Sequence, residues 1–131
     1  MGFDQYHEPP EELPAETRTF ARINASLTEE AEAIGWYEQR LAVEPSAEAR
    51  AIMRDAQGEE FKHFSMNLEF LLRRNPRWRE IAQGVLFREG DIVGHGEEAE
   101  AEGEDGGTEP GPASERDAAA GLGIGSLRSA R

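Results

Sequence analysis

Three residues with side chains that can act as acids, bases or metal ligands stand at informative spacings: Glu30, Glu60 and His63. Glu60 and His63 are three residues apart, so a helix projects them from the same side, one turn apart. Glu30 lies in a line of residues with alternating steps of four and three, which is typical of a helix seam: Ile23, Leu27, Glu30, Ile34, Tyr37 and Leu41. Burying a carboxylate in such a seam is unfavourable unless a positive charge neutralises it, and the seam contains no Lys or Arg. A metal ion is the partner that remains.

Glu60 occupies a similar position on the next segment. At about 100° per residue, Met53, Phe64 and Leu71 fall close to its direction, so Glu60 lies at the centre of an apolar face. One Glu from one helix and a Glu-x-x-His from its neighbour make half of the ligand set of a ferritin-like di-iron four-helix bundle, and a two-fold axis would supply the other half. The alternative is a coiled coil that tolerates polar seam residues, with Glu30 paired to His63 by a salt bridge.

Helical patterns and their breaks predict an all-α fold. Pro45 ends the first helix because the residue before a proline disfavours the helical region, and Ser46 can cap the next helix. Asn75-Pro76 ends the second helix. A link this short makes the two helices an antiparallel hairpin, which we expect to dimerise into a ferritin-like four-helix bundle. The predicted helices are 14–43, 47–74 and a short C-terminal helix over 76–87.

Composition divides the chain into four parts. The third part is rich in Glu, Gly and Pro and cannot bury enough apolar surface to fold, so we expect a disordered C-terminal tail. The last part carries Leu122, Ile124 and Leu127, spaced by Gly and Ser. Either these are a few apolar residues in a disordered end, or they bind in extended form to pockets of a partner protein. The four parts are an extended N-terminal arm (1–13), a helical ferritin-like domain (14–93), a disordered acidic linker (94–120) and a terminal peptide (121–131).

The charge balance excludes several classes of partner. A formal net charge of −13 argues against binding to nucleic acid or to an anionic membrane surface. The absence of cysteine excludes disulfides and thiolate metal sites, and no apolar run is long enough to span a bilayer. The first ten residues lack the basic and apolar regions of a secretory signal, so we expect a cytoplasmic protein. His7 and His95 are expected to be solvated.

With these residues in view, the sequence resembles the encapsulated ferritins, the ferritin-like cargo of encapsulin nanocompartments. A Glu-x-x-His pair alone is a weak signal, but its combination with the Glu-Glu-x-Glu pattern, Trp36-Tyr37 and the terminal peptide is a strong one. The similarity covers nearly the whole chain apart from the linker. The matching stretches are His7–Pro9, Thr28–Arg40, Glu59–His63, Asn67–Leu71, Leu86–Gly90 and Gly121–Arg128.

The resemblance implies a two-helix protomer whose antiparallel homodimer rebuilds the four-helix site at its interface, and dimers that assemble into an annular decamer. It also implies that residues 121–131 dock the protein onto the inner face of an encapsulin shell. Lys62 departs from the family, which often carries another Glu there. The site residues that the resemblance implies are the ferroxidase ligands Glu30, Glu60 and His63, the nearby Tyr37 and Trp36, and the metal-uptake carboxylates Glu29 and Glu32.

Iron suits this ligand set, because carboxylate oxygens are hard ligands and one imidazole per metal fits an oxygen-rich site. The expected reaction is oxidation of Fe(II) to Fe(III) by dioxygen for iron storage, with Glu60 bridging the di-iron pair. Zn or Co could occupy the main site in vitro, and Ca or Zn the secondary one. The alternatives are a metal-buffering helical assembly, another di-iron oxidase, or a purely structural hairpin. Glu29 and Glu32 could equally form a solvated acidic face, and Tyr37 could be a core residue rather than a redox partner.

Overall fold

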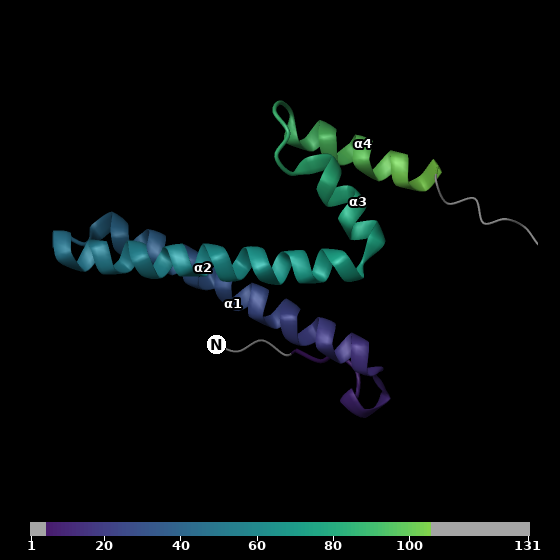
Figure 1. Cartoon of the computed structure of the whole chain (residues 1–131), viewed down its shortest axis with the longest axis horizontal. Helices are drawn as coiled ribbons and strands as arrows, with labels where there is room; N and C mark the ends of the chain where they lie inside the picture. The colour runs from purple at the N-terminus through teal and green to yellow at the C-terminus, as the bar shows by residue number, and fades with distance from the viewer. Residues whose placement is uncertain (1–4, 106–131) are drawn as a thin grey trace, which may run out of the picture.

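The computed structural model describes residues 5–105, and this part of the chain is all-helical with no strand (Figure 1). Two long helices run side by side, and two shorter helices turn away from the far end of the second. The all-α class predicted from the sequence is confirmed. The elements are a short 3-10 helix η1 (Pro10–Glu12) and the helices α1 (Ala15–Val43), α2 (Ala47–Arg74), α3 (Pro76–Val85) and α4 (Ile92–Asp105).

The α1–α2 hairpin has the bounds that its local signals predict. Glu44 adopts an extended conformation before Pro45, which ends α1 at Val43. The Ser46 hydroxyl accepts a hydrogen bond of 3.2 Å from the Ala49 N–H and so caps α2. The Glu44 carboxylate accepts a second one, of 2.9 Å, from the Ser46 N–H. Only three residues therefore connect two helices of 29 and 28 residues, and the helices must run antiparallel.

Asn75 forms the junction between α2 and α3. Its side-chain oxygen accepts a hydrogen bond of 2.9 Å from the Trp78 N–H, and Pro76 occupies the first turn of α3. The Trp78 ring lies 6.4 Å from the Phe20 ring, centroid to centroid, so α3 also contacts the start of α1. Glu69 on α2 is also paired with Arg73 of the same helix and with Arg79 of α3, so an exposed ion pair joins α2 to α3.

Two boundaries predicted from the sequence are wrong: the end of α3 and the start of the disordered linker. Helix α3 ends at Val85, not at residue 87, because Leu86 is extended and Phe87 takes a positive φ of 61° that a helix cannot accommodate. The expected linker 94–120 was predicted to be irregular from its start, yet α4 extends to Asp105. Helix α4 packs on α3, and the Arg77 guanidinium donates a hydrogen bond of 2.9 Å to the Glu100 carbonyl. These long-range contacts outweigh the poor local composition.

Gly84 allows the close approach of α3 and α4. A Cβ at Gly84 would lie 2.4 Å from the Cβ of Ala99, which is buried. We expect Gly84→Ala to separate the two helices and to speed hydrogen exchange of the α4 amides. The matched control is Gly96→Ala within α4, where an added Cβ meets nothing within 4 Å and should slow exchange, since Ala favours a helix over Gly by about 1 kcal/mol. Equal exchange in the two variants would contradict this account of α4.

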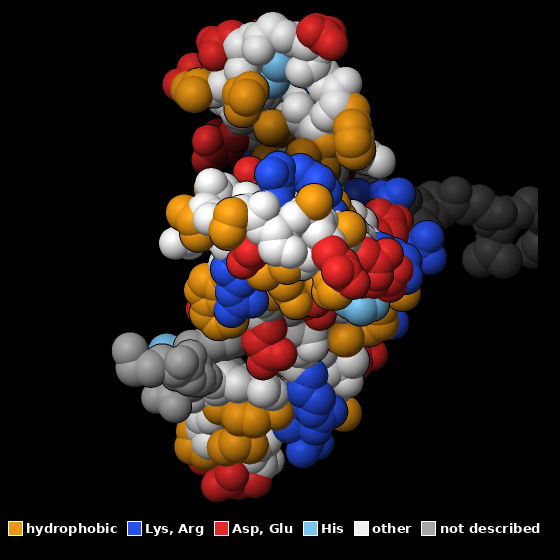
Figure 2. All heavy atoms as spheres, turned by 90° about the vertical axis from the view of Figure 1, so that its left-hand side faces the viewer, with side chains coloured by type: hydrophobic (Ala, Val, Ile, Leu, Met, Phe, Trp, Pro, Cys, Tyr) orange, Lys and Arg blue, Asp and Glu red, His pale blue; other side chains and the backbone are white. Residues whose placement is uncertain are grey.

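The described part of the chain has a small private core. Its buried hydrophobic residues are Ala25, Leu71, Leu72 and Ala99. Hydrophobic side chains are spread over the face that Figure 2 shows, between charged ones. Large apolar side chains that are more than half exposed are Trp36, Val43, Ile52, Phe61, Met66, Phe87, Ile92 and Val93. A protomer of this kind needs further partners to cover its apolar surface.

None of the described helices combines the length and the hydropathy that crossing a bilayer requires. The terminal peptide 121–131 and the last part of the expected linker lie outside the described residues. So do the first four residues of the expected extended N-terminal arm. In the described part of that arm, Pro10–Glu12 form the 3-10 helix η1 and are not extended, because the Glu12 and Leu13 N–H groups donate to the Pro9 and Pro10 carbonyls.

Candidate metal centre

The hairpin brings together the three side chains that the sequence singled out. The His63 Nδ1 atom lies 3.5 Å from Glu60 Oε2 on the same helix and 4.0 Å from Glu30 Oε1 on α1. One ligand atom from each of the three residues lies within 4.8 Å of the others. Their proximity follows from the pairing of the middle of α1 with the middle of α2. Their role as ligands stays a prediction.

The two carboxyl groups of this cluster repel each other. A hydrogen bond with Glu60 raises the pKa of Glu30 above its ordinary value of 4.5, and burial and the Glu60 charge raise it further, while His63 opposes the shift. Each of the two side chains keeps 22% of its surface exposed. The cluster therefore has more negative charge than its surroundings neutralise. Two carboxylates and an imidazole in this arrangement fit a hard divalent cation.

The raised pKa of Glu30 predicts a pH dependence of stability. A carboxyl group whose pKa is higher in the folded state stabilises the fold below its unfolded value, and this contribution is lost as the pH rises through the folded pKa. We therefore expect the metal-free Glu30→Gln variant to gain thermal stability relative to the unchanged protein as the pH rises above 4.5. The measurement is Tm against pH for both proteins in the presence of a chelator. A constant difference in Tm would contradict the repulsion between Glu30 and Glu60.

Glu59 was not assigned a role from the sequence, and Lys62 was noted there only as a departure from the family. The Glu59 Oε2 atom lies 4.0 Å from His63 Nε2, on the opposite side of the ring from Glu30 and Glu60. The same oxygen forms an ion pair with Lys62, whose hydrogen bond and charge lower the pKa of Glu59. The spacings of three and four residues on a helix were the signal that could have revealed this cluster.

Gln57 was also missed and ties the two long helices together near the site. Its side chain is buried, and its amide nitrogen donates to the Ile34 carbonyl at 3.2 Å and to Glu38 Oε2 at 3.0 Å. A polar residue one turn before Glu60 gave no sign in the sequence that it faces α1. These two bonds fix the register of α1 against α2, and hence the position of Glu30 opposite the Glu60 pair.

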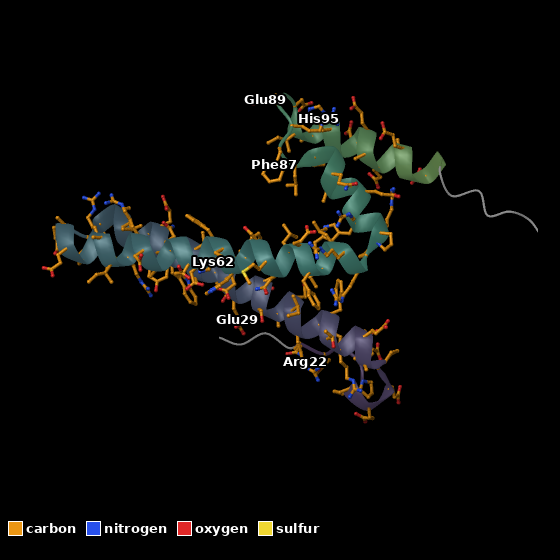
Figure 3. All side chains as sticks on the ribbon, in the orientation of Figure 1. Arg22, Glu29, Lys62, Phe87, Glu89 and His95 are labelled. Atoms are coloured by element: carbon orange, nitrogen blue, oxygen red, sulfur yellow. The ribbon has the colours of Figure 1, made fainter. Side chains whose placement is uncertain are left out.

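The remaining predicted site residues lie outside this cluster. Glu29 and Glu32 are exposed on α1, and Figure 3 shows Glu29 and Lys62 near the place where the two long helices cross. Tyr37 is half-buried two turns beyond Glu30, with the Arg40 guanidinium 5.4 Å from its ring centroid. Trp36 is 51% exposed.

His95 differs from its predicted solvated state. Only 18% of its side chain is exposed, and its Nε2 atom lies 2.8 Å from the Glu89 carbonyl (Figure 3). Its other ring nitrogen faces Glu98 at 3.7 Å. His95 thus ties the α3–α4 turn to α4 and lies on different elements from the Glu30–Glu60–His63 cluster.

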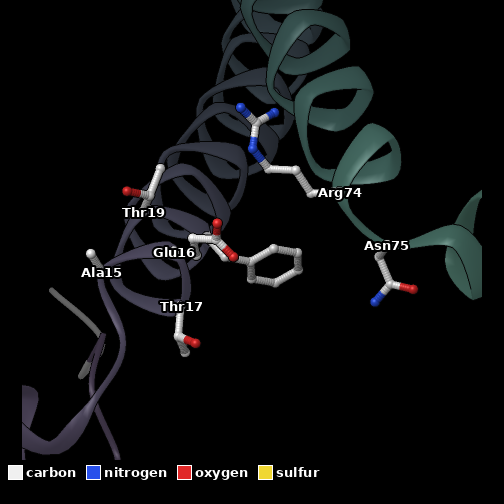
Figure 4. Close-up of a pocket in the computed structure, with 7 residues that line it drawn as sticks. Ala15, Glu16, Thr17, Thr19, Arg74 and Asn75 are labelled. Atoms are coloured by element: carbon white, nitrogen blue, oxygen red, sulfur yellow. The ribbon is translucent and has the colours of Figure 1, made fainter.

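A groove of about 640 Å³ opens between the start of α1 and the end of α2, away from the cluster (Figure 4). Its lining contains one carboxylate, Glu16, and no histidine. The Arg74 guanidinium on its edge lies over the Phe70 ring at 3.4 Å and donates to the Phe70 carbonyl. The groove therefore lacks the ligands for the metal chemistry considered above.

Comparison with known proteins gives consistent results. The model of the EncFtn-like family matches residues 5–89. An encapsulated ferritin-like protein from Rhodospirillum rubrum is 38% identical over 122 residues, which cover 93% of this chain and 86% of the relative. A ferritin-like protein from Thermotoga maritima is 41% identical over 69% of this chain and 79% of its own length. The crystal structure of protein ne0167 from Nitrosomonas europaea superimposes with a TM-score of 0.66 at 37% identity, covering 69% of this chain and 99% of that one.

Proposed function

Because this chain belongs to the EncFtn-like family, we propose that it is a ferroxidase, which oxidises Fe(II) to Fe(III) with dioxygen at a di-iron site across a homodimer interface. The observation that carries the proposal is the cluster of Glu30, Glu60 and His63, whose ligand atoms lie within 4.8 Å of one another. Each protomer contributes one Glu and one Glu-x-x-His, which is half of the set used by di-iron carboxylate bundles.

Dimerisation is required by this half-set and is supported by the surface of the hairpin. Trp36, Ile52, Phe61 and Met66 on α1 and α2 are each at least 51% exposed. Apolar side chains at this density on a two-helix unit favour packing against a second copy. The antiparallel four-helix bundle that results brings two clusters together around one pair of irons.

Iron is the substrate of the proposed reaction. Carboxylate oxygens stabilise Fe(III) over Fe(II), so Glu30 and Glu60 favour the oxidised product. Glu60 would be the ligand shared between the two irons, and one O2 would then be reduced by two electrons, one from each Fe(II). Tyr37 lies two turns from Glu30 in the same line of α1, and its proposed role is to orient the site by hydrogen bonding.

Glu29 and Glu32 form a secondary site that attracts Fe(II) before it reaches the ligands. Both are exposed on the helix that carries Glu30. The net charge of −13 adds a long-range attraction for cations. Such an exposed carboxylate site also accepts Ca or Zn in vitro.

The protein acts as cargo of an encapsulin shell in the cytoplasm and supplies it with Fe(III) for storage. The relative from Rhodospirillum rubrum carries the word encapsulated in its name. Residues 121–131 are the docking peptide, and the dimers form an annular decamer that presents several such peptides at once. Several weak contacts then act together through avidity.

The decisive experiment combines native mass measurement with oxygen consumption. Fe(II) added under anaerobic conditions is expected to convert protomers into dimers and higher assemblies, because each protomer holds half of the ligands. Admission of air should then consume oxygen in proportion to the Fe(II) added. A metal buffer would assemble without consuming oxygen, and a structural hairpin would show neither response, so either result would contradict the proposed reaction.

A further inference from the structure

His63 has acidic groups on both sides of its ring, and only one side belongs to the proposed ligand set. Nδ1 faces Glu60 at 3.5 Å and Glu30 at 4.0 Å, whereas Nε2 faces Glu59 at 4.0 Å. A ring nitrogen that binds a metal carries no hydrogen, so the hydrogen of a neutral imidazole must then reside on the other nitrogen. In this geometry Nδ1 is the nitrogen that would bind a metal together with Glu30 and Glu60, and Nε2 would then carry the hydrogen.

We infer that Glu59 is a positioning residue, which holds the Nε2–H form of His63 and thereby leaves Nδ1 free to bind the metal. This inference rests on the proposed metal site. Glu30 and Glu60 both attract a hydrogen to Nδ1 when no metal is bound, which opposes metal binding. Glu59 is the carboxylate on the other side of the ring, and it opposes that attraction.

The distance defines how Glu59 acts. At 4.0 Å the carboxylate is beyond direct hydrogen-bond range, so it acts on the ring N–H through its charge or through one bridging water. Carboxylates in this position orient the histidine ligands of many metal sites and make them better donors.

Lys62 holds Glu59 in place for this role. Its ammonium group pairs with Oε2 of Glu59, which is the same oxygen that faces His63 Nε2. Lys62 and His63 follow Glu59 by three and four residues, so all three lie on adjacent turns of α2. The carboxylate therefore stays on the side of the ring that faces away from Glu30 and Glu60.

The test uses Co(II) as the probe metal and the full-length protein. Glu59→Gln keeps the shape of the side chain but removes its charge. We expect it to weaken Co(II) binding by about tenfold, the low end of the usual range for such partners, because Glu59 is half exposed. The exchange of the His63 ring N–H with solvent in the Co(II)-bound form, followed by NMR, should become faster. Glu59→Asp, which keeps the charge, should recover part of both properties.

Glu48→Gln is the matched control, since it removes the same charge from an exposed position in the first turn of the same helix. It should leave Co(II) affinity and ring N–H exchange unchanged. Glu59→Gln that behaves like Glu48→Gln in both measurements would overturn the positioning role. His63→Ala tests the metal site separately from the role of Glu59. Loss of Co(II) binding in His63→Ala would support the metal site, whereas unchanged binding would overturn both the site and the role of Glu59.

Discussion

Replacing His63 or Glu30 by alanine is expected to slow Fe(II) oxidation by roughly 100-fold or more. Even the loss of a partner that only orients a metal ligand reduces affinity or activity about 10–100-fold, and loss of a ligand should exceed that. In a symmetric dimer each substitution also removes two ligands, one from each protomer. The four ligands that remain in either variant cannot hold both irons close enough to reduce one O2.

The rates are measured as oxygen uptake after mixing with Fe(II), at equal protomer concentration and with the assembly state checked by native mass. Glu48→Ala is the control, because Glu48 is an exposed acidic residue of α2 far from the cluster. The double variant Glu30→Ala/His63→Ala should be no slower than either single variant, since residues that act as one unit lose their effect together. Single variants that oxidise Fe(II) at the unchanged rate would contradict the proposed site.

The two long helices could be predicted from the sequence because their ends are set by local interactions. Ser46 caps α2 by its own hydroxyl, and Asn75 with Pro76 separates α2 from α3. Helix α4 could not be predicted in the same way. Its stability depends on contacts with α3 through Gly84 and Arg77, which are 15 or more residues away in the chain. The amino-acid composition of residues 92–105 does not reveal such contacts.

The candidate site, like the fold, could be predicted from the sequence only in part. The proximity of Glu30 to Glu60 and His63 could be predicted because each side breaks an apolar pattern at a position that faces the other helix. Gln57 is buried more deeply than these three residues, but a neutral polar residue does not stand out from its neighbours in the sequence. The position of Glu59 and its partner Lys62 beside His63 Nε2 could not be predicted, because it depends on side-chain conformation and not on spacing along the helix.

Removal of residues 121–131 is expected to abolish co-purification with the encapsulin shell while leaving Fe(II) oxidation by the free protein unchanged. The peptide contains Leu122, Ile124 and Leu127 separated by small residues, and an extended segment of this kind can insert alternate side chains into pockets. The proposed ligands lie more than 50 positions earlier in the chain, between 30 and 63, so the deletion removes none of them. Because an assembly presents several copies, loss of the peptide from every copy should have a much larger effect than one weak contact suggests.

Point substitutions within residues 121–131 test whether docking depends on particular side chains. Leu122→Ala/Ile124→Ala/Leu127→Ala should match the deletion, whereas Ser126→Ala should be packaged normally because it alters a position between the proposed anchors. Mixed assemblies with increasing shares of truncated protomers should lose packaging steeply only once few intact peptides remain, as avidity requires. Packaging of the fully truncated protein at the normal level would refute docking through this segment. It would transfer that role to the surface of residues 5–105, where the exposed large apolar side chains around the α3–α4 turn are Leu86, Phe87, Ile92 and Val93.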